Sequence, residues 1–389
     1  MKQYIPLGEV ITKATVERCG GNQFPILSIT MKDGLVLQDE KFKKRIASVD
    51  TSDYKVIPRG KLVQGIHIDE ANFGIQDIVD AGIVSPAYKV WDVNDRRIFP
   101  KYLEIIMRSP RSIGFYKSKL NGSVNRRGRM TDDDFLGMLI PVVDYSEQIR
   151  IVDILNRVKV VITKREHELS ALDDLIKARF VEMFGDLANP ACAWQTCRLV
   201  DSCGNNDDIK CGPFGTQLSK DEYQPTGVPV WEIPQINSAF AIPPEHFLTE
   251  AKAKQLQAYT LIPGDIVMSR KGNVGKCALF PEDKKSGVLH SDVLRIRVSV
   301  TKANPCFMMY QLHYSRDVIR QIEQVSSGAI MAGVNVTKLK EILVKLPPLG
   351  LQEQFAAFVT QIDKSKSVIQ KTLDETQLLF DSMMQKYFG

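Results

Sequence analysis

The sequence predicts a mixed α/β protein in which two similar domains are joined by two long antiparallel helices. Three observations lead to this fold class: two long helical runs, motifs that recur about 205 residues apart, and short strand patterns in each half. The predicted segments are a first domain at residues 1–140, a central helix at 141–189, a second domain at 190–346 and a C-terminal helix at 347–389. The chain is therefore predicted to be a diverged internal duplication with a pseudo-twofold axis.

Residues 147–184 form the first long predicted helix, because they contain no proline or glycine and are followed by Gly185. Steps of four and three residues from Ile151 visit ten positions, of which eight are apolar. These positions are Ile151, Leu155, Val158, Ile162, Arg165, Leu169, Leu172, Ile176, Arg179 and Met183. Such spacing is typical of a coiled-coil seam, whereas a globular helix has a broader apolar stripe. At about 1.5 Å per residue the helix would be on the order of 55 Å long, and its seam would need a partner.

A second seam lies near the C-terminus. The same stepping from Phe355 again finds eight apolar residues at ten positions. They are Phe355, Val359, Ile362, Lys366, Ile369, Leu373, Thr376, Phe380, Met383 and Tyr387. Two matched seams predict one intramolecular coiled coil, and the order of the segments makes it antiparallel with one domain at each end. In the alternative interpretation, each helix covers only the core of its own domain.

The internal repeat appears as motif pairs at an offset of 205 or 206 residues. The pairs are Tyr54-Lys-Val-Ile-Pro58 with Tyr259-Thr-Leu-Ile-Pro263, Pro100 with Pro305, and Ile140-Pro141 before Glu147-Gln148 with Leu346-Pro347 before Glu353-Gln354. Within the copies, strands are predicted at residues 25–29, 61–66, 87–91, 266–269 and 293–298. Short helices are predicted after Pro100 and Pro305, since proline suits the first helical turn, and after Thr131, a good N-cap.

Composition narrows the class of protein. A chain of 389 residues with 44% hydrophobic and 25% charged residues is typical of a globular protein with more than one domain. It shows neither an apolar run of about 20 residues nor a signal peptide at its start, so we expect a cytoplasmic protein without a membrane span. Seven cysteines, an odd number, favour a reducing compartment. Zinc binding by Cys192, Cys197, Cys203 and Cys211 is an alternative with weak support, because their spacing is irregular.

Motifs for catalysis are missing from the sequence. Residues 272–276, Gly-Asn-Val-Gly-Lys, resemble a phosphate-binding loop only in part, because the glycines are too close and Cys277 replaces the serine or threonine. His167-Glu168 lacks the second histidine of a zinc protease helix. We therefore predict a chain without an active site, cofactor or metal of its own.

Local charge indicates a polyanionic partner. The net charge is only +5, but residues 101–129 hold eight basic residues and one acidic residue, Glu104. Arginine, lysine, asparagine and glutamine can contact base edges, and lysines also contact phosphates. The candidate DNA contacts are Arg59, Lys61, His67, Arg126, Arg127 and Arg129 in the first half, and Lys210, Gln217, Lys220, Gln235, Asn237, Arg270, Lys271, Asn273 and Lys276 in the second. For each of them, the alternative is a solvated loop side chain.

Several short segments resemble the specificity subunits of type I DNA restriction-modification enzymes. In the second half they are Phe214-Gly with Leu218 and Tyr223, Gly227-Val-Pro-Val230, Gly264-Asp-Ile-Val267, Ser269-Arg-Lys-Gly272, Leu294-Arg-Ile-Arg297, and Leu346-Pro-Pro-Leu349 before Gln352-Glu-Gln354. The first half matches more loosely, through Gly82-Ile-Val-Ser-Pro-Ala-Tyr88 and Ile140-Pro141 before Glu147-Gln148. The segments 142–146 and 349–351 depart from the usual pattern and from each other.

The resemblance implies two target recognition domains, each reading one half of a split DNA sequence, with long helices as spacer and docking surface. It also implies partners: double-stranded DNA, two adenine methyltransferase subunits that bind S-adenosylmethionine, and motor-nuclease subunits that use ATP and Mg. Such a complex restricts foreign DNA. Three alternatives stay open: a related assembly with a similar subunit, a chain that methylates or cuts DNA itself, and a purely structural coiled-coil adaptor.

Overall fold

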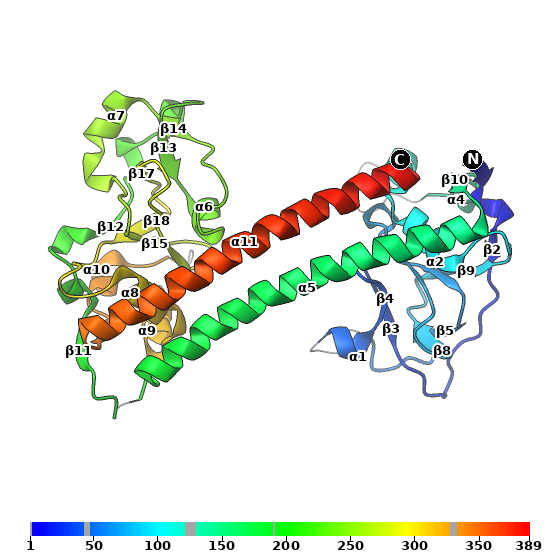
Figure 1. Cartoon of the computed structure of the whole chain (residues 1–389), viewed down its shortest axis with the longest axis horizontal. Coiled ribbons are helices and arrows are strands. Elements are labelled where there is room, and N and C mark those ends of the chain that lie inside the picture. The colour runs from blue at the N-terminus through cyan, green and yellow to red at the C-terminus, as the bar shows by residue number, and fades with distance from the viewer. Residues whose placement is uncertain (1, 43–46, 121–129, 190, 327–332) are drawn as a thin grey trace. The chain divides into compact units, whose positions relative to one another are not determined.

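The computed structural model describes residues 2–42, 47–120, 130–189, 191–326 and 333–389. The chain packs into two compact units (Figure 1). The first unit holds residues 1–167 and 370–389, and the second holds residues 168–369. Each long helix therefore contributes one part to each unit.

The first unit combines short strands with helices. Its strands are β1 Gln3–Pro6, β2 Ile11–Lys13, β3 Leu27–Thr30, β4 Gly34–Leu37, β5 Lys55–Pro58, β6 Leu62–Gln64, β7 Phe73–Ile75, β8 Ala81–Val84, β9 Lys89–Val93 and β10 Leu139–Val142. Its helices are η1 Leu7–Glu9, α1 Gln38–Lys41, η2 Ile68–Glu70, α2 Pro100–Met107, α3 Pro110–Lys119, α4 Asp132–Leu136, the start of α5 Tyr145–Phe184 and the end of α11 Leu349–Phe388. One of its two cores contains the aromatic residues Trp91, Tyr102 and Phe135, and the other is an aliphatic cluster around Leu27 and Ile57.

The second unit has the same mixed composition. Its strands are β11 Gln195–Arg198, β12 Ile209–Cys211, β13 Val228–Trp231, β14 Phe247–Leu248, β15 Ile266–Ser269, β16 Cys277–Leu279, β17 Val288–Leu289, β18 Val293–Ile296 and β19 Leu343–Leu346. Its shorter helices are η3 Leu199–Ser202, η4 Asn206–Asp208, η5 Gly215–Gln217, η6 Lys220–Glu222, α6 Ile233–Asn237, α7 Glu250–Gln255, η7 Gln257–Tyr259, α8 Pro305–Tyr314, α9 Arg316–Ser326 and α10 Val336–Lys340. The end of α5 and the start of α11 complete it.

Strand pairing shows the duplication. The four-stranded sheet of the first unit has the order β2-β9-β6-β7, and that of the second has the order β12-β18-β15-β16. Each unit also pairs its first strand with its last, β1 with β10 and β11 with β19, in antiparallel register. The predicted offset of 205 or 206 residues is too long near the long helices, which begin 204 residues apart at Tyr145 and Leu349. The predicted mixed α/β duplication is confirmed.

Seam burial confirms the predicted pairing of the long helices. Every seam position named above is buried or half-buried, while most of the other positions on both helices are exposed. In the first unit, Ile151 and Leu155 near the start of α5 share a core with Met384 and Phe388 near the end of α11. The start of one helix thus meets the end of the other, so the helices are antiparallel (Figure 1).

The same antiparallel arrangement recurs in the second unit. Phe180 and Phe184 at the end of α5 pack with Phe355 at the start of α11. An ion pair of 2.6 Å joins Lys366 Nζ to Asp173 Oδ1 across the two helices. The alternative, in which each helix covers only its own preceding domain, is therefore wrong.

Local signals place the shorter elements where the sequence predicts them. Pro100 and Pro305 are the first residues of α2 and α8. Thr131 caps α4 by accepting a hydrogen bond from the Asp134 backbone N–H. Strand β15 has the predicted limits 266–269, and α5 ends before Gly185, which adopts a positive φ of 74°.

The seven cysteines are free thiols. In the described ranges, no group of three or more Cys, His, Asp or Glu side chains is placed to hold a metal ion. None of the helices that the structure describes is both long and apolar enough to cross a membrane.

Candidate nucleic-acid interface

The connection between β15 and β16 carries four of the predicted contacts in the second unit. Residues 270–276 form a compact turn in which the Ser269 N–H donates to the Lys276 carbonyl at 2.8 Å. Gly272 and Gly275 adopt positive φ angles of 70° and 83°. Glycine is favoured at such angles because it has no Cβ. The turn leaves Asn273 and Lys276 exposed.

The two remaining cations of this turn are held by neighbours. Arg270 donates from Nε to the Val334 carbonyl at 3.2 Å, and its guanidinium lies 4.9 Å from the centroid of the Phe214 ring. Lys271 Nζ lies 2.7 Å from Asp292 Oδ1. Both side chains are therefore oriented before any ligand arrives, which reduces the entropy that binding costs.

A second set of contacts connects Lys210 and Gln217 with the Phe214 backbone and with Tyr259. Gln217 Oε1 accepts hydrogen bonds from the Phe214 backbone N–H at 3.2 Å and from the Tyr259 hydroxyl at 3.1 Å. Lys210 Nζ lies 5.4 Å from the centroid of the Tyr259 ring. The structure thus brings Lys210, Gln217 and Arg270 together through two aromatic residues.

Gly212 allows the loop that follows β12 and carries Phe214 to lie close to the sheet. A Cβ at Gly212 would be 2.2 Å from the carbonyl oxygen of His290. The Gly212 N–H donates to the Val293 carbonyl at 3.1 Å, which joins the start of the loop to β18. Any larger residue would push the Phe214 loop away from the Arg270 turn.

Carboxylates balance the cations of this surface. Asp207 lies 3.5 Å from Lys210, and Asp292 pairs with Lys271. Each pair has one side chain that is only 26% or 28% exposed, and its other member is more exposed to solvent, where a phosphate can compete with the carboxylate for the lysine. The chemistry suits reversible binding of a polyanion.

Other predicted contacts of the second unit lie apart from this group. Gln235 is only 1% exposed, and its amide is committed to the Glu232 backbone N–H and the Pro243 carbonyl. Asn237 is half-buried, with a buried Oδ1 that has no hydrogen-bond partner among the described residues. Lys220 is exposed on η6.

A histidine contacts the start of β16, directly after the 270–276 turn. His313 of α8 accepts a hydrogen bond at Nε2 from the Cys277 backbone N–H at 3.1 Å. The Cys277 Sγ lies 3.3 Å from the same nitrogen. Burial lowers the pKa of His313, with a smaller contribution from Lys276, and burial raises the pKa of the Cys277 thiol. The pair therefore favours a neutral imidazole and a protonated thiol, which suits a structural contact and not a nucleophile.

The first unit does not bring its described candidates together. Arg59 precedes β6, donates to the Asp77 carbonyl and lies 3.7 Å from Asp80. Lys61, at the same end of β6, pairs with Asp92 of β9. His67 follows β6, at the opposite end of the strand. Arg126, Arg127 and Arg129 lie outside the described residues.

The segment that contains Lys210, Gln217 and Arg270 matches a known domain family. Residues 208–376 match the family described as the type I restriction modification DNA specificity domain. The resemblance seen in the sequence is thereby confirmed for this segment, which covers most of the second unit.

One curated relative matches part of the chain. It is a putative type I restriction enzyme specificity subunit of Methanocaldococcus jannaschii, 28% identical over 177 residues. The match covers 44% of this chain and 41% of that protein, so the aligned segment spans less than half the length of either.

Two solved structures resemble the whole chain in fold. One is from a study of complex assembly and conformational transition in a type I restriction-modification system, with a TM-score of 0.54 and 19% identity. The other is a type I restriction-modification S subunit from M. genitalium, with a TM-score of 0.58 and 12% identity. Each alignment covers 100% of this chain, and 97% and 96% of the other chains. At these identities the likeness concerns the fold alone.

Three residues of this surface, Phe214, Tyr259 and Asp292, were not among the predicted contacts. Phe214 is 45% exposed beneath Arg270, and Tyr259 connects Lys210 with Gln217. Phe214 stood out in the sequence only within the segments that carry the resemblance. Tyr259 stood out only as part of the internal repeat, and Asp292 had no local signal.

Proposed function

We propose that this chain is the non-catalytic DNA-recognition subunit of a type I restriction-modification complex. Residues 1–140 and 190–346 would each read one half of a bipartite target. The long helices at 141–189 and 347–389 would fix the spacing between the half-sites. A cytoplasmic location, where cellular and incoming DNA meet such a complex, follows from this role.

One observation carries the proposal. The specificity domain at residues 208–376 includes the surface where Lys210, Gln217 and Arg270 meet around Phe214 and Tyr259. Cations and amides presented on glycine-rich turns are suited to phosphates and base edges. An aromatic neighbour restrains the guanidinium, so that its fork can be presented in one orientation.

Methyltransferase subunits, two in number, are the proposed partners of the long helices. In the first unit, Val160 and Val161 of α5 are 52% and 43% exposed, and Leu378 and Leu379 of α11 are 72% and 53% exposed. These residues lie outside the paired seam, so the coiled coil does not use them. Exposed adjacent apolar side chains are suited to a protein interface. S-adenosylmethionine, ATP and Mg would bind to the methyltransferase and motor-nuclease subunits.

Mapping methylated adenines in cells with and without this gene tests the proposal directly. We expect one bipartite motif to lose methylation when the gene is deleted and to regain it when the gene is restored. As a control, the Arg270→Ala variant should change or weaken the motif while the partner subunits remain expressed. Persistence of every methylated motif after deletion would contradict the proposal.

Two further measurements separate the alternatives. A methyltransferase in its own right would bind S-adenosylmethionine, so titration of the isolated chain by calorimetry should give no heat of binding if our proposal is correct. A purely structural adaptor would not need DNA. Retention on duplex DNA that weakens steeply with salt is expected of a DNA-recognition subunit and not of an adaptor.

A further inference from the structure

The turn between β3 and β4 is a rigid element of the first unit. The Asp33 backbone N–H donates to Thr30 Oγ1 at 2.9 Å, and Lys41 Nζ pairs with Asp33 at 2.7 Å. Gly34 has a φ of 75°, and a Cβ there would lie 2.7 Å from Glu104 Oε1. The chain at this turn is thus closed on itself and lies tightly against α2.

Arg108, at the end of α2, holds the backbone of this turn. Its Nη2 donates to the carbonyl of Met31 and, at 2.8 Å, to the carbonyl of Lys32. Only 16% of the Arg108 side chain is exposed, and Glu104 lies 3.7 Å away. Both turn carbonyls are therefore satisfied by one largely buried cation.

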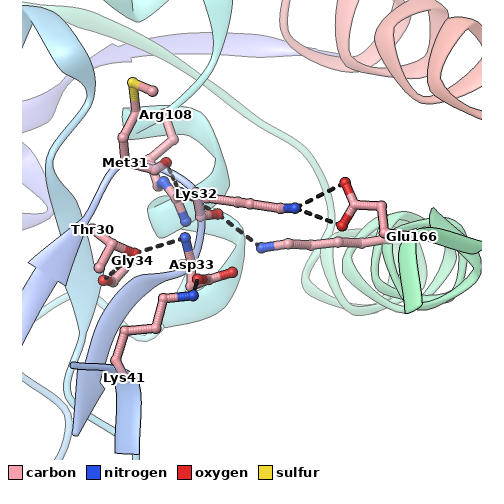
Figure 2. Close-up of polar contacts among 9 residues, drawn as sticks. Thr30, Met31, Lys32, Asp33, Gly34, Lys41, Arg108 and Glu166 are labelled. Carbon is pink, nitrogen blue, oxygen red and sulfur yellow. Dashed lines mark hydrogen bonds and ion pairs between the residues drawn. The ribbon is translucent and has the colours of Figure 1, made fainter. Parts of the chain in front are cut away.

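The long helix α5 contacts Lys32 of this turn at two points (Figure 2). Lys159 Nζ donates to the Lys32 carbonyl at 3.2 Å. The Lys32 ammonium reaches Glu166 in the other direction, at 2.9 and 2.6 Å from its two carboxylate oxygens. Lys159 and Glu166 are seven residues apart, which places them two turns apart on one face of the helix. The backbone and the side chain of Lys32 are thus bound by α5.

These polar contacts are important because apolar packing does not fill the space beside them. The turn borders a cavity of about 710 Å³ lined by Met31, Lys32, Lys159, Ile162 and residues of α2, α3 and α11. Burial lowers the pKa of Lys159, and the nearby Arg108 lowers it further. Since Lys159 is a partly desolvated cation, its hydrogen bond to the Lys32 carbonyl is stronger than a solvated one.

The turn is mechanically connected to the candidate DNA contacts of the first unit. A Cβ at Gly74 would lie 2.5 Å from the Leu35 nitrogen, so β4 and β7 are in close contact. Strand β7 pairs with β6, and the connection between them carries His67. At the positions of α11 equivalent to Lys159 and Glu166, the sequence has Asp363 and Gln370, so the arrangement belongs to the first unit alone.

We infer that Lys159 and Glu166 are positioning residues that anchor the first recognition unit to α5 through the β3–β4 turn. The inference rests on the proposed function in one respect: the anchored unit is the one that reads the first half-site. Loss of the anchor would leave the unit folded but let it tilt on the helix, so that the native distance between half-sites would no longer be preferred.

Hydrogen exchange of the full-length chain without DNA tests the anchor. We expect Lys32→Glu, Glu166→Lys and Lys159→Met each to raise exchange several-fold in residues 31–37. The double reversal Lys32→Glu with Glu166→Lys should restore protection, because it restores the ion pair, and Lys159→Arg should retain it. Arg157→Ala, which removes an exposed pair with Asp153 on the same helix, is the matched control and should change nothing.

Unchanged exchange in the three single variants would overturn the anchor. The anchor would also be overturned if the double reversal or the Lys159→Arg variant folds but exchanges as fast as the single variants. A general loss of stability would then explain the faster exchange.

Binding to duplexes with altered half-site spacing tests the positioning role. Once the target is mapped, we expect wild type to prefer the native spacing and the single variants to lose that preference by about threefold to tenfold, the range of one modest contact. Raised exchange with an unaltered spacing preference would overturn the positioning role. A wild-type chain without sequence-specific binding would overturn the proposed function instead, and hydrogen exchange would still decide the anchor.

Discussion

Gln148 and Gln352 occupy equivalent positions, 204 residues apart, near the starts of α5 and α11, and both are fully buried. Gln148 Oε1 accepts from the Phe99 N–H at 2.8 Å, and Gln352 Oε1 accepts from the Asn304 N–H at 2.9 Å. Phe99 and Asn304 are the N-cap residues of α2 and α8. One amide therefore joins each long helix to the start of the short helix beside it.

Replacing Gln352 by alanine should destabilise the second unit. The change removes the partners of the half-buried Asn304 N–H and of the buried Pro347 carbonyl, which accepts from Nε2 at 2.6 Å. At about 1 to 3 kcal/mol for each unsatisfied group, the two together cost about 2 to 6 kcal/mol in the free energy of unfolding. Denaturant unfolding followed by circular dichroism measures this, with the exposed Gln354→Ala as the control. Equal stability of the two variants would contradict the role of the buried amide.

The second unit should lose stability as the pH falls below about 6.5, partly through His313. Burial lowers its folded-state pKa below the ordinary value of 6.5, so the unfolded chain binds more protons in the window between the two values. The contribution of neutral His313 to the free energy of unfolding is fully present above pH 6.5. It is lost as the pH falls through the lowered folded-state pKa. Protonation also removes the acceptor for the Cys277 N–H.

Thermal unfolding at a series of pH values, with His313→Gln and His167→Gln, tests this. The first variant should show a smaller loss of stability at acidic pH than wild type. The second, at an exposed position of α5, should follow wild type. Parallel curves for wild type and His313→Gln would rule the histidine out as the source.

Arg270→Ala or Lys271→Ala should weaken specific DNA binding without unfolding the chain. A bidentate arginine contact with guanine is worth about 1 to 3 kcal/mol of discrimination, and each lost phosphate contact lowers the salt slope by about 1. Fluorescence anisotropy against target and scrambled duplexes at several salt concentrations measures both quantities. The exposed Lys371→Ala on α11 is the control. Unchanged sequence preference and salt slope in both variants would count against this surface.

Removing seven residues from each long helix should keep the seams in register and shorten each helix by about 10 Å. If the helices set the half-site spacing, the methylated motif should acquire a shorter spacer, or binding should be lost. A deletion of four residues from each helix breaks the heptad register and is the control for folding. Methylation that persists at the original spacing would show that the helices do not set it.

A fragment of residues 1–185 should dimerise through its exposed seam. In the full chain, Phe388 packs against Tyr102 of α2 at 5.4 Å between ring centroids, and its counterpart Phe184 packs against Phe307 of α8 at 4.7 Å. In the fragment, Phe184 of a second copy can take the place of Phe388. Two identical units would then be related by a true twofold axis, although Arg165 and Arg179 in the seams would lower affinity.

Sedimentation velocity of the fragment tests the dimer, and Phe184→Ala should weaken it. If the methyltransferase accepts the dimer, the methylated motif should become palindromic, with the first half-site in inverted repeat. A soluble, folded monomer would contradict the exchange of Phe388 for Phe184.

The sequence alone was sufficient for the local elements and the duplication. The seams of α5 and α11 could be predicted because a heptad pattern depends only on spacing along one chain. Pro100, Pro305 and Thr131 mark helix starts because proline geometry and capping act within a few residues.

Only the tertiary structure decided which side chains meet. Lys210, Gln217 and Arg270 are brought together by the pairing of β12 and β15 with β18 and by the Phe214 loop. Gln235 had the same polar character in the sequence, yet the short helix α6 turns its amide inward to hydrogen bonds with its own neighbours. The attachment of Lys32 to Glu166 joins residues 134 positions apart. Contacts of this kind depend on strand register and packing over long separations, which local spacing does not encode.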